Sequence, residues 1–258
     1  MFILYLLIAL LATFIGSMTG MGGGIIMKPI MDALSHFDSA SINILSSVTV
    51  FAMSLVSVIK RFTGKGKGAP LPFSVSRLLF LTAGSVGGGY LGQLIFDTVQ
   101  RSLPAIKGVQ NALMLILVIF IFFYMLFKER LPRLNFKSIP AFLLAGVFMG
   151  VLSSFLGIGG GPVNVALLTF LFGMGIKDAV FTSLLSVLFT QTSKLITVLA
   201  TTGFAVFELS MLPFTVIGGI VGATVGAALG KRLSPKATSL LFCIVQILIF
   251  AICLYNIF

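Results

Sequence analysis

Charged side chains are scarce in this sequence, and tryptophan is absent. Only 9% of the 258 residues are charged and 58% are hydrophobic, whereas a soluble domain carries about 25% charged residues. A chain of this composition could not cover a surface that faces water. Because a membrane-spanning helix needs about 20 apolar residues, the sequence predicts an all-α polytopic membrane protein, located in the cell membrane with the lipid bilayer as its surroundings.

Groups that perform catalysis or bind metals are also few. There is one histidine, and both cysteines, Cys243 and Cys253, lie in the last apolar run, which gives no basis for a disulfide framework or a metal site. An intramembrane hydrolase would need a general base or metal ligands. We therefore expect no enzyme, no catalytic residue, no bound metal and no cofactor. All six carboxylates lie near the ends of apolar runs, so none is expected at depth: Asp32, Asp38, Asp97, Glu129, Asp178 and Glu208.

The formal net charge is +11, which would suggest a nucleic-acid partner for a soluble protein. Here the basic residues lie mostly in short loops between apolar runs, where they set the orientation of a membrane protein, so we expect no nucleic-acid partner. The loop that contains Lys60, Arg61, Lys65 and Lys67 is predicted to face the cytoplasm. Residues 202–208 contain neither Lys nor Arg, and this loop is predicted to face outside.

Two glycine clusters indicate an internal duplication. Residues 20–24 read GMGGG and residues 157–162 read GIGGGP, an offset of 137 residues from Gly20 to Gly157. Residues 40–48 and 179–187 form a second match in the same order. Three matches in one order are typical of a repeat. The third match is a pair of glycine rows whose four-residue spacing suits close helix packing: Gly84, Gly88 and Gly92, and Gly218, Gly222 and Gly226.

The duplication predicts two transmembrane repeats, residues 1–127 and 139–258, joined by a basic cytoplasmic linker over residues 128–138. Because equivalent loops are predicted on opposite sides, the repeats should be inverted, which requires an odd number of crossings in each. Five crossings per repeat give about ten if the short runs after the glycine clusters, Ile25–Leu34 and Pro162–Phe172, count as crossings. Both termini are then predicted outside. Eight crossings with parallel halves are the alternative.

The glycine clusters are also the predicted binding site. Glycine triplets free backbone groups that hydrocarbon cannot satisfy, and in transporters with inverted repeats paired breaks form the substrate site, with helix N-termini aimed at anions. Close helix packing is the other interpretation of such glycines. Short polar side chains follow each break, although they can also bond their own backbone. Lys194, taken as the only lysine well away from a loop, is a functional candidate unless it snorkels to an interface.

Polar donors without a deep carboxylate favour an anionic solute over a cation. The residues predicted to bind it are Gly22, Gly23, Gly24, Asn43, Ser47, Gly159, Gly160, Gly161, Pro162, Asn164, Thr182, Ser183, Ser186, Gln191 and Lys194.

At these residues the sequence resembles the TauE/SafE family of membrane proteins, also called the sulfite exporter or toluenesulfonate-uptake permease family. The resemblance covers essentially the whole chain and is most specific where Pro162 follows Gly161; the first cluster has Ile25 at that position. It implies transport of small sulfur-containing anions such as sulfite, sulfonates or sulfoacetate. We expect an alternating-access carrier, with a channel-like anion pore along the same glycine-lined path as the alternative, and a homo-oligomer is compatible with either.

Overall fold

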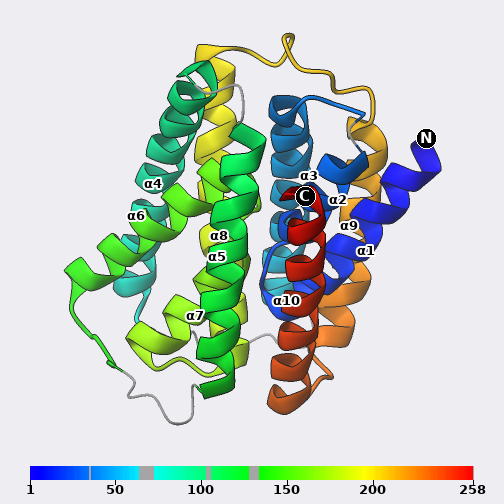
Figure 1. Cartoon of the computed structure of the whole chain (residues 1–258). Coiled ribbons are helices and arrows are strands. Elements are labelled where there is room, and N and C mark those ends of the chain that lie inside the picture. Colours follow the sequence, from blue (N-terminus) through cyan, green and yellow to red (C-terminus); the bar gives the residue numbers. More distant parts are fainter. Residues whose placement is uncertain (35, 64–72, 103–105, 128–133, 258) are drawn as a thin grey trace.

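The protein is built from helices (Figure 1). The computed structural model describes residues 1–34, 36–63, 73–102, 106–127 and 134–257, and no strand occurs within these ranges. The expected all-α class is therefore confirmed. In chain order the helices are α1 (Phe2–Thr19), α2 (Gly24–Leu34), α3 (Ser39–Thr63), α4 (Val75–Ser102), α5 (Ile106–Phe127), α6 (Ile139–Leu156), α7 (Gly161–Phe172), α8 (Ile176–Thr201), α9 (Leu212–Gly230) and α10 (Pro235–Ile257).

Most of these helices are suited to a bilayer. Eight of the described helices are long and apolar enough to cross a membrane; α2 and α7 are not among them. The long helices carry large exposed hydrophobic side chains, such as Ile116 at 62%, Phe120 at 73% and Leu144 at 67% exposure. Hydrocarbon is the solvent in which such side chains are stable. The chain is therefore a multi-pass membrane protein, as its composition predicts.

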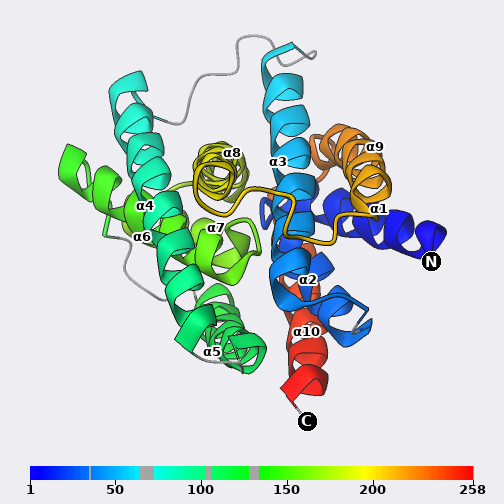
Figure 2. The same ribbon diagram turned by 90° about the horizontal axis from the view of Figure 1, so that it is seen from above.

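The two halves contain the same series of five helices. The first two members of each series match in length, with 18 residues in both α1 and α6, and 11 and 12 residues in α2 and α7. Packing between the halves also corresponds, because α4 packs on α6 as α9 packs on α1. Figure 2 shows α3 and α8 between these two pairs.

The glycine rows of α4 and α9 lie where these pairs meet. A Cβ atom on Gly88 would overlap the backbone carbonyl of Val147 on α6, and one on Gly222 would overlap the carbonyl of Leu10 on α1. The interpretation of these rows as close helix contacts is confirmed. The remaining contacts follow in the same register: Gly84 with Leu143, Gly92 with Val151, Gly218 with Leu6, and Gly226 with Phe14.

The central helices α3 and α8 run in opposite directions. Ala40 at the start of α3 lines a cavity together with Thr202, which follows α8. At the other end, Arg61 near the end of α3 lines a second cavity with Lys177 at the start of α8. The two helices hold the same place, third of five, in their series of helices.

The end of the molecule with Arg61 and Lys177 also contains Lys60 and Lys231, whose ammonium groups donate to the carbonyls of Thr224 and Lys60, each at 3.0 Å. We call this end the basic end and the opposite one the far end. Lys65 and Lys67 lie outside the described residues.

Both short helices fold back along the helix before them. The Tyr5 hydroxyl, near the start of α1, lies 3.0 Å from Nδ1 of His36, just after α2. In the second half, the amide of Phe136, just before α6, donates to the carbonyl of Leu171 at the end of α7 over 2.8 Å. Each glycine cluster is therefore the tip of a helical hairpin. The expectation that these short segments add two further crossings is not supported by this arrangement.

Candidate anion-binding site

The tips of the two hairpins meet inside the molecule. Each tip begins with a left-handed glycine that ends the long helix, Gly20 with φ 73° and Gly157 with φ 67°. Two residues on, Gly22 and Gly159 are also left-handed and touch, since a Cβ on Gly22 would overlap the Gly159 carbonyl oxygen. Glycine is required at this contact both for its positive φ and for its lack of a side chain.

Serines from the opposite half hold the two tips. The Ser183 hydroxyl on α8 donates to the Gly20 carbonyl over 2.7 Å. The equivalent Ser46 hydroxyl on α3 donates to the Gly157 carbonyl over 3.0 Å. These bonds satisfy carbonyls that the ends of α1 and α6 leave free, so Ser183 stabilises the hairpin tip in this conformation.

The glycine amides expected to hold an anion are enclosed by protein. The Gly23 amide donates to Sδ of Met53 at 3.3 Å, and thioether sulfur is a weak acceptor. A Cβ on Gly24 would lie 2.7 Å from both the Ile158 carbonyl oxygen and the Ser46 hydroxyl. The tips are thus closed against each other here, and the amide of Gly23 has an acceptor that an oxyanion could improve upon.

Lys194 is fully buried on α8. Its ammonium group donates to Oδ1 of Asn43 on α3 at 2.7 Å and to the Ser154 carbonyl at the end of α6 at 3.1 Å. Because the side chain ends in these two interior contacts, it does not snorkel. The structure therefore brings together two residues, Asn43 and Lys194, that the sequence places in different halves.

A second buried lysine corrects the expectation that Lys194 is alone. Lys28 on α2 is fully buried and pairs with Oδ2 of Asp32 at 3.0 Å. Asp32 is also fully buried, so the expectation that no carboxylate lies at depth is wrong. Both residues were judged by their distance along the chain from a loop, but the hairpin folds α2 into the interior, where α3 and α10 pack on it.

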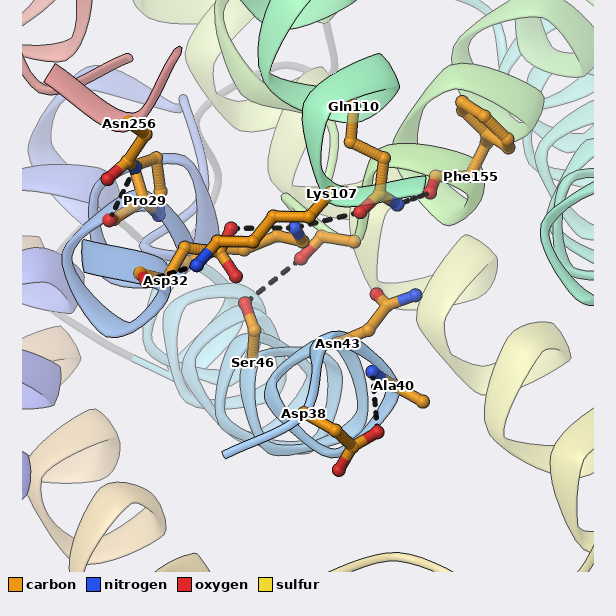
Figure 3. A network of polar contacts seen from close by, with 12 residues as sticks. Pro29, Asp32, Asp38, Ala40, Asn43, Ser46, Lys107, Gln110, Phe155 and Asn256 are labelled. Atoms are coloured by element: carbon orange, nitrogen blue, oxygen red, sulfur yellow. Dashed lines mark hydrogen bonds and ion pairs between the residues drawn. The ribbon is translucent and has the colours of Figure 1, made fainter. Parts of the chain in front are cut away.

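A chain of polar contacts leads from the pair of Lys28 and Asp32 to the end of α6. Figure 3 labels Asp32, Gln110 and Phe155 along it. The Lys28 ammonium group donates to Oε1 of Gln110 on α5 at 2.9 Å. The amide nitrogen of Gln110 donates in turn to the Phe155 carbonyl at 2.6 Å. That carbonyl is adjacent in sequence to the Ser154 carbonyl that accepts from Lys194. Both lysines thus converge on the C-terminal end of α6, which carries free carbonyls and the negative end of the helix dipole.

Several buried polar atoms around this centre have no hydrogen-bond partner in the protein. They include Nδ2 of Asn43, Oγ of Ser154 and both polar atoms of Asn164. Asn164 follows the second tip, where its Nδ2 lies against Gly160. Buried polar groups are normally satisfied by protein, water or a ligand. The side chains of Thr182 and Gln191 on α8 belong to the same class of buried, unpartnered groups.

Not every predicted binding residue is available in this conformation. The Ser47 hydroxyl bonds its own helix at the Asn43 carbonyl, 2.7 Å away. The Ser186 hydroxyl lies 2.7 Å from that of Ser85 on α4. Pro162 occupies the first turn of α7, where its missing amide hydrogen costs nothing. Gly160 and Gly161 are both left-handed, with φ 91° and 51°, and complete the second tip.

Sequence reasoning missed Lys28, Asp32, Gln110 and Ser154. One signal was present for the first two, since Lys28 and Asp32 stand four residues apart and therefore share a helix face. Gln110 and Ser154 carry no local signal, because their roles depend on α5 and α6 meeting α2 and α8 in space.

Two cavities lie at opposite ends of the central helices α3 and α8. The cavity at the basic end, about 100 Å³, is lined by three cationic side chains, Arg61, Lys177 and Lys231. The cavity at the far end, about 340 Å³, includes Asp97, whose carboxylate accepts from Gln93 at 2.7 Å.

Comparison with known families identifies one match. Residues 5–253 match the model of the family described as sulfite exporter TauE/SafE. Comparison with curated proteins gave no match. The matched segment includes both hairpin tips, both buried lysines and all the residues that line the two cavities.

Proposed function

We propose that this chain, which belongs to the sulfite exporter TauE/SafE family of membrane transporters, carries small sulfur-containing anions. Transport would proceed by alternating access between two inverted repeats. The anion would bind beside Lys194 at the meeting point of the hairpin tips. The observation that carries this proposal is a buried cation located at paired helix breaks, with a cavity toward each end of the molecule.

The chemistry of the centre suits an oxyanion. A sulfonate or sulfite group presents several acceptor oxygens and no strong donor, so it needs cations and N–H or O–H donors around it. Lys194 supplies charge, and Asn43 and Ser154 supply donors that have no acceptor in the closed state. Binding would therefore satisfy groups that are costly to leave unpaired in a low-dielectric interior.

The closed contact between Gly22 and Gly159 supports a carrier over a pore. A channel needs a continuous path, whereas alternating access requires a centre that is closed to at least one side at all times. Paired breaks between inverted repeats provide such a centre, because rocking of one repeat against the other can open it to either side. The opposite directions of α3 and α8 are consistent with that relation.

The direct test is transport in proteoliposomes that contain the purified protein. We expect labelled sulfite or sulfoacetate to enter with saturable kinetics, and unlabelled solute inside to accelerate entry by counterflow. Non-saturating electrical conductance without counterflow would instead identify the anion pore. No flux of either kind for any sulfur oxyanion would contradict the proposal.

Charge predicts the orientation. We propose that the basic end faces the cytoplasm and that both termini lie outside. In a variant with Cys243 and Cys253 replaced by alanine, single cysteines at the exposed positions Val206 and Lys236 should react with an impermeant maleimide from opposite sides of the membrane. Labelling of both positions from the same side would refute this topology.

A further inference from the structure

The cavity at the basic end is the counterpart, in the duplicated scaffold, of the space around Lys194. Three of its lining residues belong to duplicated helices: Ser17, Ser57 and Val180. At the offset of 137 residues between the glycine clusters, their equivalents are Ser154, Lys194 and Asn43. These are the three residues that the hydrogen bonds of Lys194 join. The position that a lysine side chain fills in one half is therefore open space in the other.

A cation is nevertheless present on the same face of the central helix. Arg61 follows Ser57 by four residues on α3, so it lies one turn nearer the basic end on the same face. The position equivalent to Arg61 on α8 is Val198. Each central helix thus carries one cation on this face, Lys194 in the interior and Arg61 at the basic-end cavity.

The guanidinium group of Arg61 is held by an aromatic ring. Its central carbon lies over the ring of Phe181, 5.0 Å from the ring centre, and both side chains line the cavity. Stacking of this kind orients a guanidinium group without using its N–H donors. Within the described residues, Arg61 forms no ion pair with a carboxylate. Its donors are therefore available to an oxyanion.

Two further cations line the same cavity. The ammonium groups of Lys177 and Lys231 donate to backbone carbonyls, those of Lys231 at 3.4 Å and Lys60 at 3.0 Å. A neutral carbonyl positions an ammonium group but does not cancel its charge. Asp178 follows Lys177 in sequence but is not among the lining residues. A cavity lined by charge of one sign attracts ions of the opposite sign.

The inner wall and the size of the cavity suit a small oxyanion. The buried hydroxyl groups of Ser17, Ser57 and Thr238 line it. Each donates to a carbonyl of its own chain neighbourhood in this structure, and a hydroxyl can rotate to donate to a ligand instead. The volume of about 100 Å³ has room for sulfite or sulfate, since one water molecule occupies about 30 Å³ in the liquid.

We propose that the cavity at the basic end is a second binding site for small oxyanions, in which Arg61 takes the part that Lys194 takes at the hairpin tips. An anion that arrives from the basic end binds here before it reaches the centre. This inference rests on the proposed function for its role in transport, whereas binding in the cavity can be measured without transport. Basic residues that only set the orientation of the chain need no cavity.

The number of anions bound per chain provides the first test. Equilibrium dialysis of the detergent-purified protein against labelled sulfite, without oxygen, measures it. Wild-type protein should bind two at saturation, whereas Lys194→Met and the double variant Arg61→Gln with Lys231→Gln should each bind one. Lys236→Gln removes an exposed lysine of the same end that does not line the cavity, and this control should bind two.

The pattern of loss separates the inference from the proposed function. If wild-type protein bound one anion and the double variant kept it, the second site would be refuted and the central site would stand. If wild-type protein bound one anion that the double variant lost and Lys194→Met kept, the second site would stand and the central site would be refuted. Absence of binding would refute both.

Salt dependence in the wild-type protein is the second test and needs no variant. Lys177 and Lys231 are exposed, whereas Lys194 is fully buried. Raising potassium gluconate from about 0.1 M to about 1 M shortens the screening length from about 10 Å to about 3 Å. One of the two anions should then bind about tenfold more weakly, and the other should change by no more than about twofold. The same salt response for both anions would overturn the inference.

Competition in Lys194→Met identifies the source of the anion. Unlabelled sulfate should displace the remaining sulfite, and micelles that contain phosphatidylglycerol should not. Displacement by the lipid but not by sulfate would assign the cavity to a lipid headgroup and overturn the inference.

Discussion

The two halves of this protein are alike in backbone and unlike in chemistry. The hairpin tips, the serines that hold them and the glycine rows of α4 and α9 correspond residue by residue. The buried charges do not, because Lys28 and Asp32 belong to the first half alone and Lys194 to the second, where its equivalent in the first half is Ser57. The duplicated features shape the scaffold, and we propose that the unique residues determine which solute it binds.

The largest expected effect concerns the duplicated contact at the tips. Gly22→Ala and Gly159→Ala should each destabilise the protein by about 3 kcal/mol. An alanine at positive φ costs about 1–2 kcal/mol, and overpacking adds about 1–3 kcal/mol. Thermal unfolding in detergent measures the effect. Gly87→Ala is the matched control, since a Cβ there meets nothing within 4 Å, and it should be neutral or slightly stabilising. Equal stability of all three variants would refute the contact.

The next effect tests the unique chemistry of the second half. Lys194→Met should lower sulfite uptake by about 100-fold with little change in the amount of folded protein, because a desolvated charge that contacts a ligand contributes about 2–5 kcal/mol. Initial rates in proteoliposomes, normalised to monomeric protein from gel filtration, measure it. Lys236→Gln removes an exposed lysine at the basic end and should leave uptake within about twofold. Full activity of Lys194→Met would remove this lysine from the binding site.

The hairpin tips and the buried Asp32 differ in how far the sequence could predict them. The glycine clusters reveal the hairpin tips because a break in an apolar helix leaves a local signature, and equivalence between the halves adds a second, independent indication. The burial of Asp32 leaves no such signature. Its short distance from the end of an apolar run suggested a position at the membrane surface. Asp32 is inside the molecule because α2 folds back along α1 and α10 packs on α2.

The number of crossings is hard to predict from the sequence for a related reason. Charge in the loops correctly groups Lys60 and Arg61 with Lys231 at one end of the molecule. That grouping is the same whether a short segment crosses the membrane or folds back after a partial crossing, so charge alone could not separate the two. The bond between Phe136 and Leu171 is information that the loop charges do not contain, because it ties the end of α7 to the segment just before α6.

A smaller effect tests how similar the helix packing is in the two halves. Gly88→Ala and Gly222→Ala should each destabilise the protein by about 2 kcal/mol, within the range of overpacking, because each added methyl meets a backbone carbonyl that cannot rotate away. The comparison depends on the two losses of stability being equal, and thermal unfolding of both variants in detergent measures them. If one variant lost several times more stability than the other, the packing of α4 on α6 would not be equivalent to that of α9 on α1.

The smallest effect separates the two cavities. Arg61 stands with Lys177 and Lys231 in a cavity that contains no carboxylate among its lining residues, whereas Arg101 shares the far-end cavity with Asp97 and Asp38. Arg61→Gln should therefore raise the KM for anion entering from the basic end by about two- to fivefold. Added salt should reduce the difference, since partly exposed charges attract solute over no more than about 10 Å at 0.1 M ionic strength.

Arg101→Gln is the matched change for this last comparison. It removes the arginine that lines this cavity together with two carboxylates, so the KM for entry from the far end should rise by a similar factor while entry from the basic end is unaffected. Oriented proteoliposomes, with orientation checked by the cysteine at Val206, measure both constants. If Arg61→Gln raised KM equally from both ends, its charge would act on the shared centre beside Lys194, and the cavities would not collect solute separately.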